Sequence, residues 1–439
     1  MKKNLLLVLI ILAIFIVGCS KTKEDKNLTS TTKDPTITIV SKGYDWGPAN
    51  YKLVIDLEDS VQGEVNKEAF SVRGFKKVMN FKTMEEEDLD DEVAITTAYV
   101  SDEAGEKADS GKYISLELLV HPDAKLTAPY TFKLDTFKNI KDQVKYTVTL
   151  NENLTLNKEI KEFTRVSNDQ TETIYEGIEN FEEYDFNYTD EKFGEIELKY
   201  GLFVPKEKEN KPLIILFHGA GEGGKDVSIA LLGNKVVALA EKEIQSYFEN
   251  AYVLVPQTPD MWMNDGSGEY TTDGSSKYTN ALIEMIEKVL ESNPGIDSKR
   301  VYVGGGSNGG FMTMNMILNK PDLFAAAFAI CQAYQSEWIS DEQIKNLKDV
   351  PLWFVHSTDD STVSFESTTK ALHQRLVSSG HKNVHLSVYD GVFDKTGLYK
   401  DSEGQPYQYN GHWSWIPVFN DEVKDNETGL FSWLALQTK

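Results

Sequence analysis

Residues 304–310 carry the pattern Gly-Gly-Gly-Ser-Asn-Gly-Gly, in which Ser307 lies between Gly305 and Gly309. An apolar, β-branched run precedes the pattern and a Met-rich stretch follows it, which predicts a strand, a sharp turn and a helix. A serine on such a turn needs small residues two positions before and after it, because the strand and helix backbones crowd there. We therefore interpret Ser307 as a nucleophile for acyl transfer.

Two alternatives fit the glycines alone. One is an ordinary turn, and the other is a phosphate-binding loop with Gly304, Gly306 and Gly309 in G-x-G-x-x-G spacing. A dinucleotide site also needs an acidic ribose-binding residue on a second strand about 20 residues further on, and the chain has none there. The nucleophile interpretation is favoured.

A serine nucleophile needs a base and a third group that orients the base. In the chain order that accompanies this turn, the acid and then the histidine follow the serine. The histidines downstream of the serine are His356, His373, His381, His385 and His412. His412 lies in the late, aromatic loop Asn410-Gly411-His412-Trp413-Ser414-Trp415, and we predict it as the base. The alternative is a structural histidine packed by aromatic rings.

The predicted acid is Asp360. It follows an apolar strand-like run, and catalytic groups gather at the carboxyl ends of strands in open α/β sheets. Asp359 is the alternative acid, and Asp390 and Asp394 are further candidates. A non-catalytic interpretation is that Asp359 and Asp360 simply form a turn.

Oxyanion donors are predicted upstream of the serine. His218-Gly219-Ala220-Gly221 ends another strand-like run, and a turn of this kind can aim backbone N–H groups at developing negative charge. We assign the amides of Ala220 and Asn308 to this role. A purely structural glycine turn is the alternative.

Trp262, Gln332 and Tyr334 follow predicted strands and are candidates for lining an acyl or aromatic pocket, although core packing is an equal alternative for Trp262. Cys331 is interpreted as a small buried residue. No His, Cys or Asp cluster has metal-ligand spacing, so we expect neither a metal nor a cofactor.

The charge of the chain limits its partners. Its 439 residues include 45 basic and 69 acidic side chains, a net charge of −24. Nucleic acids and anionic membrane surfaces would repel such a chain, so neither is an expected partner. A small neutral or cationic substrate fits better.

The N-terminus begins with two lysines and continues with an apolar run from Leu5 to Gly18, which has the length of a signal peptide. The run ends in Ile16-Val17-Gly18-Cys19, which resembles the lipobox of bacterial lipoproteins. The resemblance implies a signal peptide over residues 1–18, a lipid on Cys19 and a polar tether over residues 19–35. We expect an exported protein anchored to the bacterial cell envelope; a plain leader is the alternative.

Two domains are predicted after the tether. Residues 36–165 contain strand-like segments without helical periodicity, typical of an Ig-like β-sandwich. The acidic run at 85–92 is expected to be a solvated loop. In residues 166–439 short apolar runs alternate with helical stretches, which predicts a mostly parallel sheet covered on both faces.

The elbow around Ser307, the His218 turn, Asp360 and the His412 loop together resemble α/β-hydrolase esterases related to poly(3-hydroxybutyrate) depolymerases and the prolyl oligopeptidase clan. Upstream, Asp45-Trp46-Gly47-Pro48-Ala49 resembles the Ig-like N-terminal domain of a bacterial esterase family.

The resemblance implies a Ser–Asp–His carboxylesterase for short or medium acyl esters. It also implies that the Ig-like domain assists substrate access or assembly into a homo-oligomer. Alternatives are a serine peptidase, a polyester or polysaccharide-ester hydrolase, and a non-catalytic binding protein. One departure from the family pattern is Glu222, which follows Gly221 where a further glycine is expected.

Overall fold

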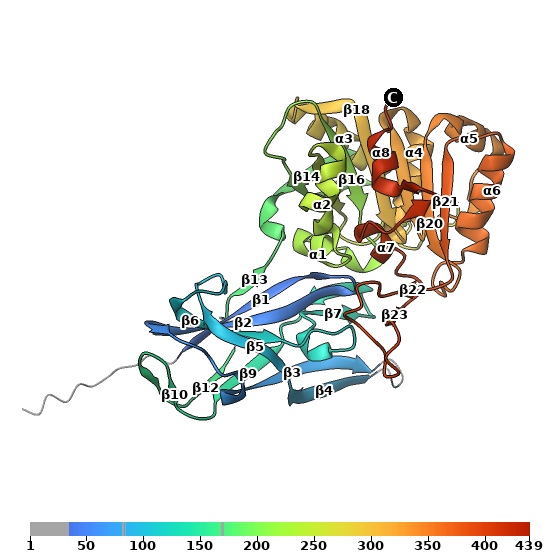
Figure 1. Ribbon diagram of the computed structural model, residues 1–439. Helices are drawn as coiled ribbons and strands as arrows, with labels where there is room; N and C mark the ends of the chain where they lie inside the picture. The colour runs from blue at the N-terminus through green and yellow to red at the C-terminus, as the bar shows by residue number, and fades with distance from the viewer. Residues whose placement is uncertain (1–34, 81–82, 84, 168–170) are drawn as a thin grey trace, which may run out of the picture. The chain divides into compact units, whose positions relative to one another are not determined.

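The computed structural model describes residues 35–80, 83, 85–167 and 171–439, and its first part is a sandwich of two sheets (Figure 1). One sheet has the strand order β13-β1-β2-β6-β5 and the other β12-β9-β3-β4. Their bounds are β1 (Thr36–Tyr44), β2 (Gly47–Gln62), β3 (Phe70–Asn80), β4 (Glu85–Glu92), β5 (Ile95–Ser101), β6 (Ser110–Leu118), β9 (Lys145–Leu150), β12 (Phe163–Val166) and β13 (Thr173–Tyr175). Short strand pairs join them, namely β7 (Tyr130–Lys133) with β8 (Lys138–Lys141) and β10 (Leu154–Thr155) with β11 (Glu159–Ile160).

Alternation of side chains builds the sandwich. Along β9, Tyr146, Val148 and Leu150 are buried while the residues between them are not. They meet Leu53 of β2 and Leu116 of β6 in one apolar cluster between the sheets. Burial of apolar area between two half-buried sheets is the main stabilising contribution in this architecture. The predicted Ig-like β-sandwich is confirmed.

The acidic run at 85–92 is not a loop. It forms the edge strand β4, which pairs antiparallel with β3. Basic side chains on β3 bond to it across the strands: Arg73 to Asp90 at 2.6 Å and Lys77 to Asp88 at 2.8 Å. Backbone pairing and opposite charges can hold an exposed edge strand that has almost no apolar side chains.

The second part contains a sheet of eight strands in the order β14-β15-β17-β16-β18-β19-β20-β21. The first three pair antiparallel and the others pair parallel, so the predicted mostly parallel sheet is confirmed. The bounds are β14 (Phe181–Asp190), β15 (Gly194–Phe203), β16 (Lys211–Phe217), β17 (Tyr252–Gln257), β18 (Ile296–Gly306), β19 (Ala326–Ile330), β20 (Leu352–Ser357) and β21 (Val384–Tyr389). Smaller pairs follow, β22 (Val392–Phe393) with β23 (Gln408–Tyr409) and β24 (Lys424–Asp425) with β25 (Thr428–Gly429).

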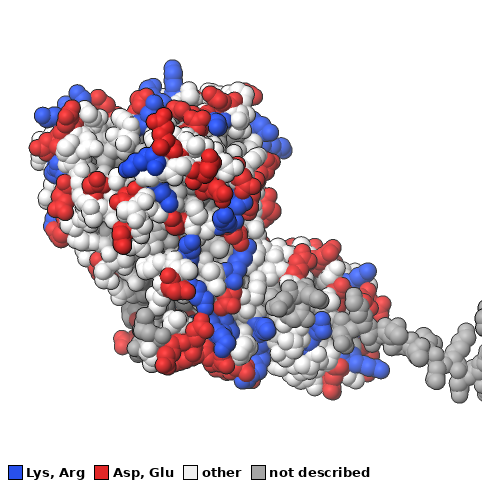
Figure 2. Space-filling view, turned by 180° about the vertical axis from the view of Figure 1, so that it is seen from behind, with Lys and Arg blue, Asp and Glu red and all other residues white. Residues whose placement is uncertain are grey.

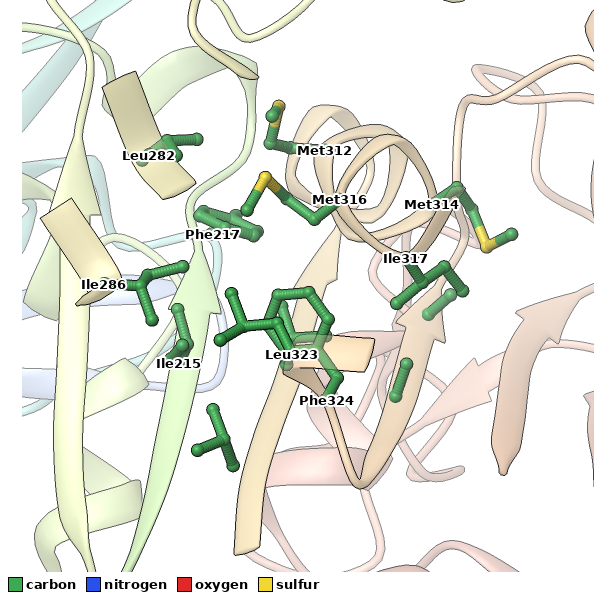
Figure 3. Close-up of a cluster of buried hydrophobic side chains, with 14 of the residues drawn as sticks. Ile215, Phe217, Leu282, Ile286, Met312, Met314, Met316, Ile317, Leu323 and Phe324 are labelled. Carbon is green, nitrogen blue, oxygen red and sulfur yellow. The ribbon is translucent and has the colours of Figure 1, made fainter. Parts of the chain in front are cut away.

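Helices cover both faces of this sheet (Figure 1). They are α1 (Val227–Leu232), α2 (Lys242–Gln245), α3 (Thr279–Ser292), α4 (Asn308–Asn319), α5 (Asp341–Asn346), α6 (Ala371–Ser378), α7 (Trp415–Phe419) and α8 (Leu430–Ala435). One apolar cluster joins α3 and α4 to the sheet and a second joins α1 and α8 to it. Figure 3 shows the first cluster, with Met316 of α4 beside Phe217 of β16.

Residues 229–248 form short helical pieces and not one continuous helix. The helix α1 ends at Gly233, and Lys235 then adopts a left-handed φ of 58° before the chain continues in short turns. A left-handed residue interrupts the helical hydrogen-bond ladder. Apolar side chains from these pieces still pack on the sheet.

The predicted leader, Cys19 and nearly all of the tether lie outside the described residues. No helix among the described residues has both the length and the apolar character needed to cross a membrane. On the surface shown in Figure 2, acidic side chains are interspersed with basic ones.

Candidate active site

Ser307 lies on a strained turn between β18 and α4. Its φ is +56°, which L-residues with side chains rarely adopt. A Cβ added to Gly309 would lie 1.9 Å from the carbonyl oxygen of Phe217, and one added to Gly305 would lie 2.5 Å from the Gly309 backbone. Glycines two residues before and after Ser307 are therefore required by backbone contact. Gly310 lets α4 approach the chain after β19, because a Cβ there would lie 2.7 Å from Cα of Gln332.

The structure brings Ser307, His412 and Asp360 together. Nε2 of His412 lies 2.9 Å from Oγ of Ser307, and Nδ1 of His412 lies 2.8 Å from Oδ2 of Asp360. The three side chains come from the start of α4, the loop before α7 and the loop after β20. With Nδ1–H donating to the carboxylate, Nε2 is free to accept the serine proton, as a general base requires.

The Asp360 carboxyl is held by four donors. Its Oδ1 accepts the amides of Thr362 and Val363, and its Oδ2 accepts His412 and also Nε2 of His356 at 3.0 Å. Burial by itself raises the pKa of Asp360, but the hydrogen bonds from the two histidines outweigh burial and hold its pKa well below the usual range. Asp360 is thus an anion in the folded protein.

The other candidate acids lie elsewhere. Asp359 accepts the hydroxyl of Ser357, and Asp394 holds its own loop through Thr396 and the Gly397 amide. Sequence reasoning missed His356 as a partner of the acid, although it lies only four residues before Asp360. That spacing of four residues across a strand end is the signal that could have found it.

The two predicted oxyanion donors begin short helical segments. Ala220 opens the 3₁₀ turn η4 (Ala220–Glu222), and Asn308 opens α4. First-turn amides have no partner within their own helix, so they are available to an anion.

A neutral histidine supports the Ala220 turn. Nε2 of His218 accepts the Thr258 amide at 3.2 Å, and Nδ1–H donates to the Gly219 carbonyl at 2.6 Å. Burial lowers the pKa of His218 to about 4. The ring is therefore uncharged at neutral pH and serves as a structural donor and acceptor.

Trp262, Gln332 and Tyr334 do not line an open pocket. Trp262 and Gln332 are fully buried and Tyr334 is 4% exposed. The Trp262 amide donates to Oδ1 of Asn308, and its indole N–H donates to the His218 carbonyl. The tryptophan thus ties together the two segments that carry the predicted oxyanion donors. All three residues follow strands, but tight packing turns their side chains into the core, which for Trp262 is the alternative that the sequence left open.

Glu222, the departure from the family pattern, is a buried carboxyl in the oxyanion turn. It is 5% exposed, and its oxygens accept the side-chain amides of Asn139 at 3.1 Å and Asn234 at 3.3 Å. Burial raises its pKa to about 7, although the amide hydrogen bonds act in the opposite direction.

A cleft of about 350 Å³ opens beside Ala220. The β7–β8 connection forms one wall, and the loop after β17 forms the other. Its lining residues are Leu134, Asp135, Thr136, Phe137, Lys138, Ala220, Asp260, Met261, Asn264, Gly268, Glu269 and Tyr270. Phe137 and Tyr270 are exposed aromatic side chains at this cleft. The sequence could not indicate a cleft whose walls lie more than 80 residues apart in the chain.

Cys331, Asp360 and His412 offer ligand-type atoms within 4.8 Å of one another. The acid and the base already bond to each other, and burial raises the pKa of the Cys331 thiol well above its usual value. The thiol therefore stays protonated beside the triad, where it fills space as a small apolar group.

Comparison with known proteins agrees with this architecture. Residues 36–161 match the family described as esterase Ig-like N-terminal domain, and residues 200–396 match that described as phospholipase/carboxylesterase. A solved structure described as a thermostable esterase is 27% identical and superposes with a TM-score of 0.73, covering 92% of this chain and 100% of its own.

Two curated proteins are similar to a portion of the chain. Acyl-protein thioesterase 1 from Eremothecium gossypii is 25% identical over 42% of this chain and 80% of its own length. Feruloyl esterase B from Thermothelomyces thermophilus is 28% identical over 28% of this chain and 40% of its own length. The chain is a serine hydrolase of the carboxylic ester hydrolase class, in which an esterase Ig-like N-terminal domain precedes an α/β-hydrolase domain of the carboxylesterase type.

Proposed function

We propose that the protein hydrolyses short- or medium-chain carboxylic esters through an acyl-enzyme on Ser307. The observation that carries this proposal is the unbroken chain of hydrogen bonds from Ser307 through His412 to Asp360. The amides of Ala220 and Asn308 supply the electrostatic complement for the oxyanion.

Acylation begins when Oγ of Ser307 attacks the ester carbonyl carbon and its proton passes to Nε2 of His412. The carbonyl oxygen becomes an anion that accepts the Ala220 and Asn308 amides, a contribution of several kcal/mol in sites of this kind, roughly 3. Asp360 stabilises the imidazolium through Nδ1–H. His412 then returns the proton to the departing alkoxide, and the alcohol leaves.

Deacylation repeats the sequence with water. His412 removes a proton from the water molecule, whose oxygen attacks the acyl carbon, and the tetrahedral intermediate collapses with Oγ of Ser307 as leaving group. The carboxylic acid leaves and the serine regains its proton from His412.

A polysaccharide or polyester ester is the second candidate substrate. The cleft beside Ala220 carries polar side chains together with the exposed rings of Phe137 and Tyr270. Such a surface suits the hydroxyl-rich or aromatic part of a larger ester, and a feruloyl esterase is among the relatives described above.

Labelling and a substrate series test the proposal. A fluorophosphonate probe is expected to label wild type and not Ser307→Ala. Absence of labelling in folded wild-type protein would contradict serine hydrolysis. p-Nitrophenyl esters from acetyl to palmitoyl, assayed beside proline-containing peptide amides, are expected to show fastest turnover for short or medium acyl groups. Faster peptide turnover would instead identify a peptidase, and preference for acetylated or feruloylated polysaccharide would favour the second candidate.

We also propose that the protein is exported and anchored to the cell envelope through a lipid on Cys19, on the basis of the lipobox-like leader. Two or more acyl chains would give a stable anchor, since each buried methylene contributes about 0.8 kcal/mol. Cys19→Ala is expected to move the protein from the membrane fraction to the soluble fraction. Retention of the variant on membranes would contradict the lipid anchor.

Assembly into a homo-oligomer through the Ig-like domain is proposed from the resemblance alone. Light scattering of the purified chain from residue 35 onward is expected to give a mass that is a multiple of the chain mass. A monomer at micromolar concentration would contradict it.

A further inference from the structure

A second histidine bonds to the carboxyl oxygen that faces the catalytic base. Nε2 of His356 lies 3.0 Å from Oδ2 of Asp360, the same oxygen that lies 2.8 Å from Nδ1 of His412. The side chains of His356 and Asp360 are both fully buried. Water therefore does not compete for this oxygen, and its hydrogen bonds come from the two rings.

The partners of His356 fix its tautomer. Nε2 lies between Oδ2 of Asp360 and the carbonyl oxygen of Val363 at 3.2 Å, and both of these groups are acceptors only. Nε2 must therefore carry a proton. On the opposite side of the ring, Nδ1 lies 2.8 Å from Oγ1 of Thr369, whose hydroxyl can donate to it.

The ring is also fixed in place by its surroundings. Thr369 is fully buried in η10 (Glu366–Lys370), a π-helical turn that directly precedes α6. Phe365 contacts the face of His356 edge-on, with ring centroids 5.4 Å apart. Single π-turns inside helices occur frequently at functional sites.

We propose that His356, oriented by Thr369, is a positioning residue of the catalytic triad. Its Nε2–H fixes the rotamer of Asp360 and takes up part of the charge on Oδ2. Asp360 then accepts the Nδ1–H of His412 in one orientation without drawing that proton to itself. This role rests on the proposed function of Ser307, His412 and Asp360.

Three titratable groups surround the Asp360 carboxyl. They are His356 on β20, His412 from the loop before α7 and Cys331 after β19. Cys331 stays protonated, so the charge that His412 experiences comes from Asp360. Loss of the His356 donor would leave more negative charge on Oδ2, which strengthens the attraction of Asp360 for an imidazolium at His412.

The decisive variant is His356→Leu, with the pH dependence of kcat/KM for a p-nitrophenyl ester as the readout. We expect kcat on the pH plateau to fall about tenfold or more, as for loss of a hydrogen bond to a charged group. KM is expected to change little. The acid limb, which is the fall of kcat/KM on the low-pH side of the profile, is expected to move to higher pH. A merely structural role would lower thermal stability without moving that limb.

Two further variants are expected to shift the acid limb less than His356→Leu does. His356→Gln keeps an N–H near the position of Nε2 and is expected to restore the wild-type acid limb. Thr369→Val keeps the shape of Thr369 but removes its hydroxyl, and a smaller upward shift is expected. If His356→Leu does not fold, the Thr369→Val profile decides the question.

His381 provides the matched control. It is buried in the same domain, and its Nε2 lies 2.9 Å from the Val350 carbonyl, away from the triad. His381→Leu is expected to leave the acid limb unchanged. An acid limb that does not move in folded His356→Leu, or in Thr369→Val where it serves as the deciding variant, would overturn the proposal, whatever the plateau kcat. Fluorophosphonate labelling of wild type tests the proposed function separately.

Discussion

Two buried carboxyl groups of the α/β-hydrolase domain behave in opposite ways. Asp360 follows β20 and Glu222 follows β16, and both side chains are almost fully removed from water. Asp360 accepts two imidazoles and two backbone amides, whereas the side-chain donors to Glu222 are the amides of Asn139 and Asn234. The pKa of Asp360 is lowered, and that of Glu222 is raised to about 7.

The comparison shows that the donor set decides the charge state of a buried acid. Burial raises the pKa of both groups, so burial cannot explain the difference. An imidazole that becomes a cation favours the anion of its partner far more than a neutral amide does. Asp360 is consequently charged where the triad needs an anion. Glu222 is half neutral near pH 7, in the turn that also carries the predicted oxyanion donor Ala220.

Asp360→Asn removes the negative charge of the first carboxyl, and we expect it to lower kcat more than any other change considered below. An asparagine cannot stabilise the imidazolium and presents an N–H to Nδ1 as readily as an oxygen, which favours the wrong tautomer of His412. Plateau kcat is expected to fall roughly 10⁴-fold, as for this change in other serine triads. Single-turnover acylation by a p-nitrophenyl ester measures the loss. Glu222→Gln is the matched change on the other side and is expected to alter kcat by less than about tenfold.

The two carboxyls also predict opposite dependences of stability on pH. The folded-state pKa of Glu222 lies above its unfolded value of 4.5, so its contribution is fully present below pH 4.5 and is lost as the pH rises through about 7. The lost free energy of unfolding is about 3 kcal/mol. The lowered pKa of Asp360 acts the other way, because its contribution is present above pH 3.8 and is lost as the pH falls.

Urea denaturation of wild type and Glu222→Gln at several pH values measures the Glu222 contribution. The variant is expected to gain stability relative to wild type between pH 5 and pH 8, by about 3 kcal/mol. Parallel stability curves for the two proteins would mean that Glu222 ionises in the folded state as readily as in the unfolded state.

Local patterns in the sequence predicted one of these carboxyls better than the other. Asp360 follows an apolar strand and precedes a loop histidine in the chain order of a serine triad, so its place could be inferred before the fold was known. The glycines around Ser307 were equally informative, because backbone crowding at Gly305 and Gly309 leaves no room for a side chain.

The environment of Glu222 could not be predicted in the same way. Its carboxyl accepts a hydrogen bond from Asn139, which lies 83 residues earlier in the chain, on strand β8 of the β7–β8 pair. For Trp262 the sequence left pocket lining and core packing equally open for a related reason, since a strand end can turn a side chain either outward or into the core. His356 was missed because the histidines were considered only as candidate bases. A histidine can also donate a hydrogen bond to the acid, and the residue type does not distinguish the two roles.

Asn139→Ala tests how much one amide donor lowers the pKa of Glu222, and its expected effect is the smallest of those predicted. Loss of one amide donor leaves the Glu222 anion less stabilised, so its pKa should rise above 7 by less than one unit, about 1 kcal/mol. The measurement compares the pH dependence of stability of Asn139→Ala with that of the Asn139→Ala, Glu222→Gln double variant. The difference between the two is expected to develop at higher pH than the corresponding difference for wild type. A midpoint that does not move would show that the Asn139 amide does not stabilise the Glu222 anion, and burial together with the Asn234 amide would then set the charge state of this carboxyl.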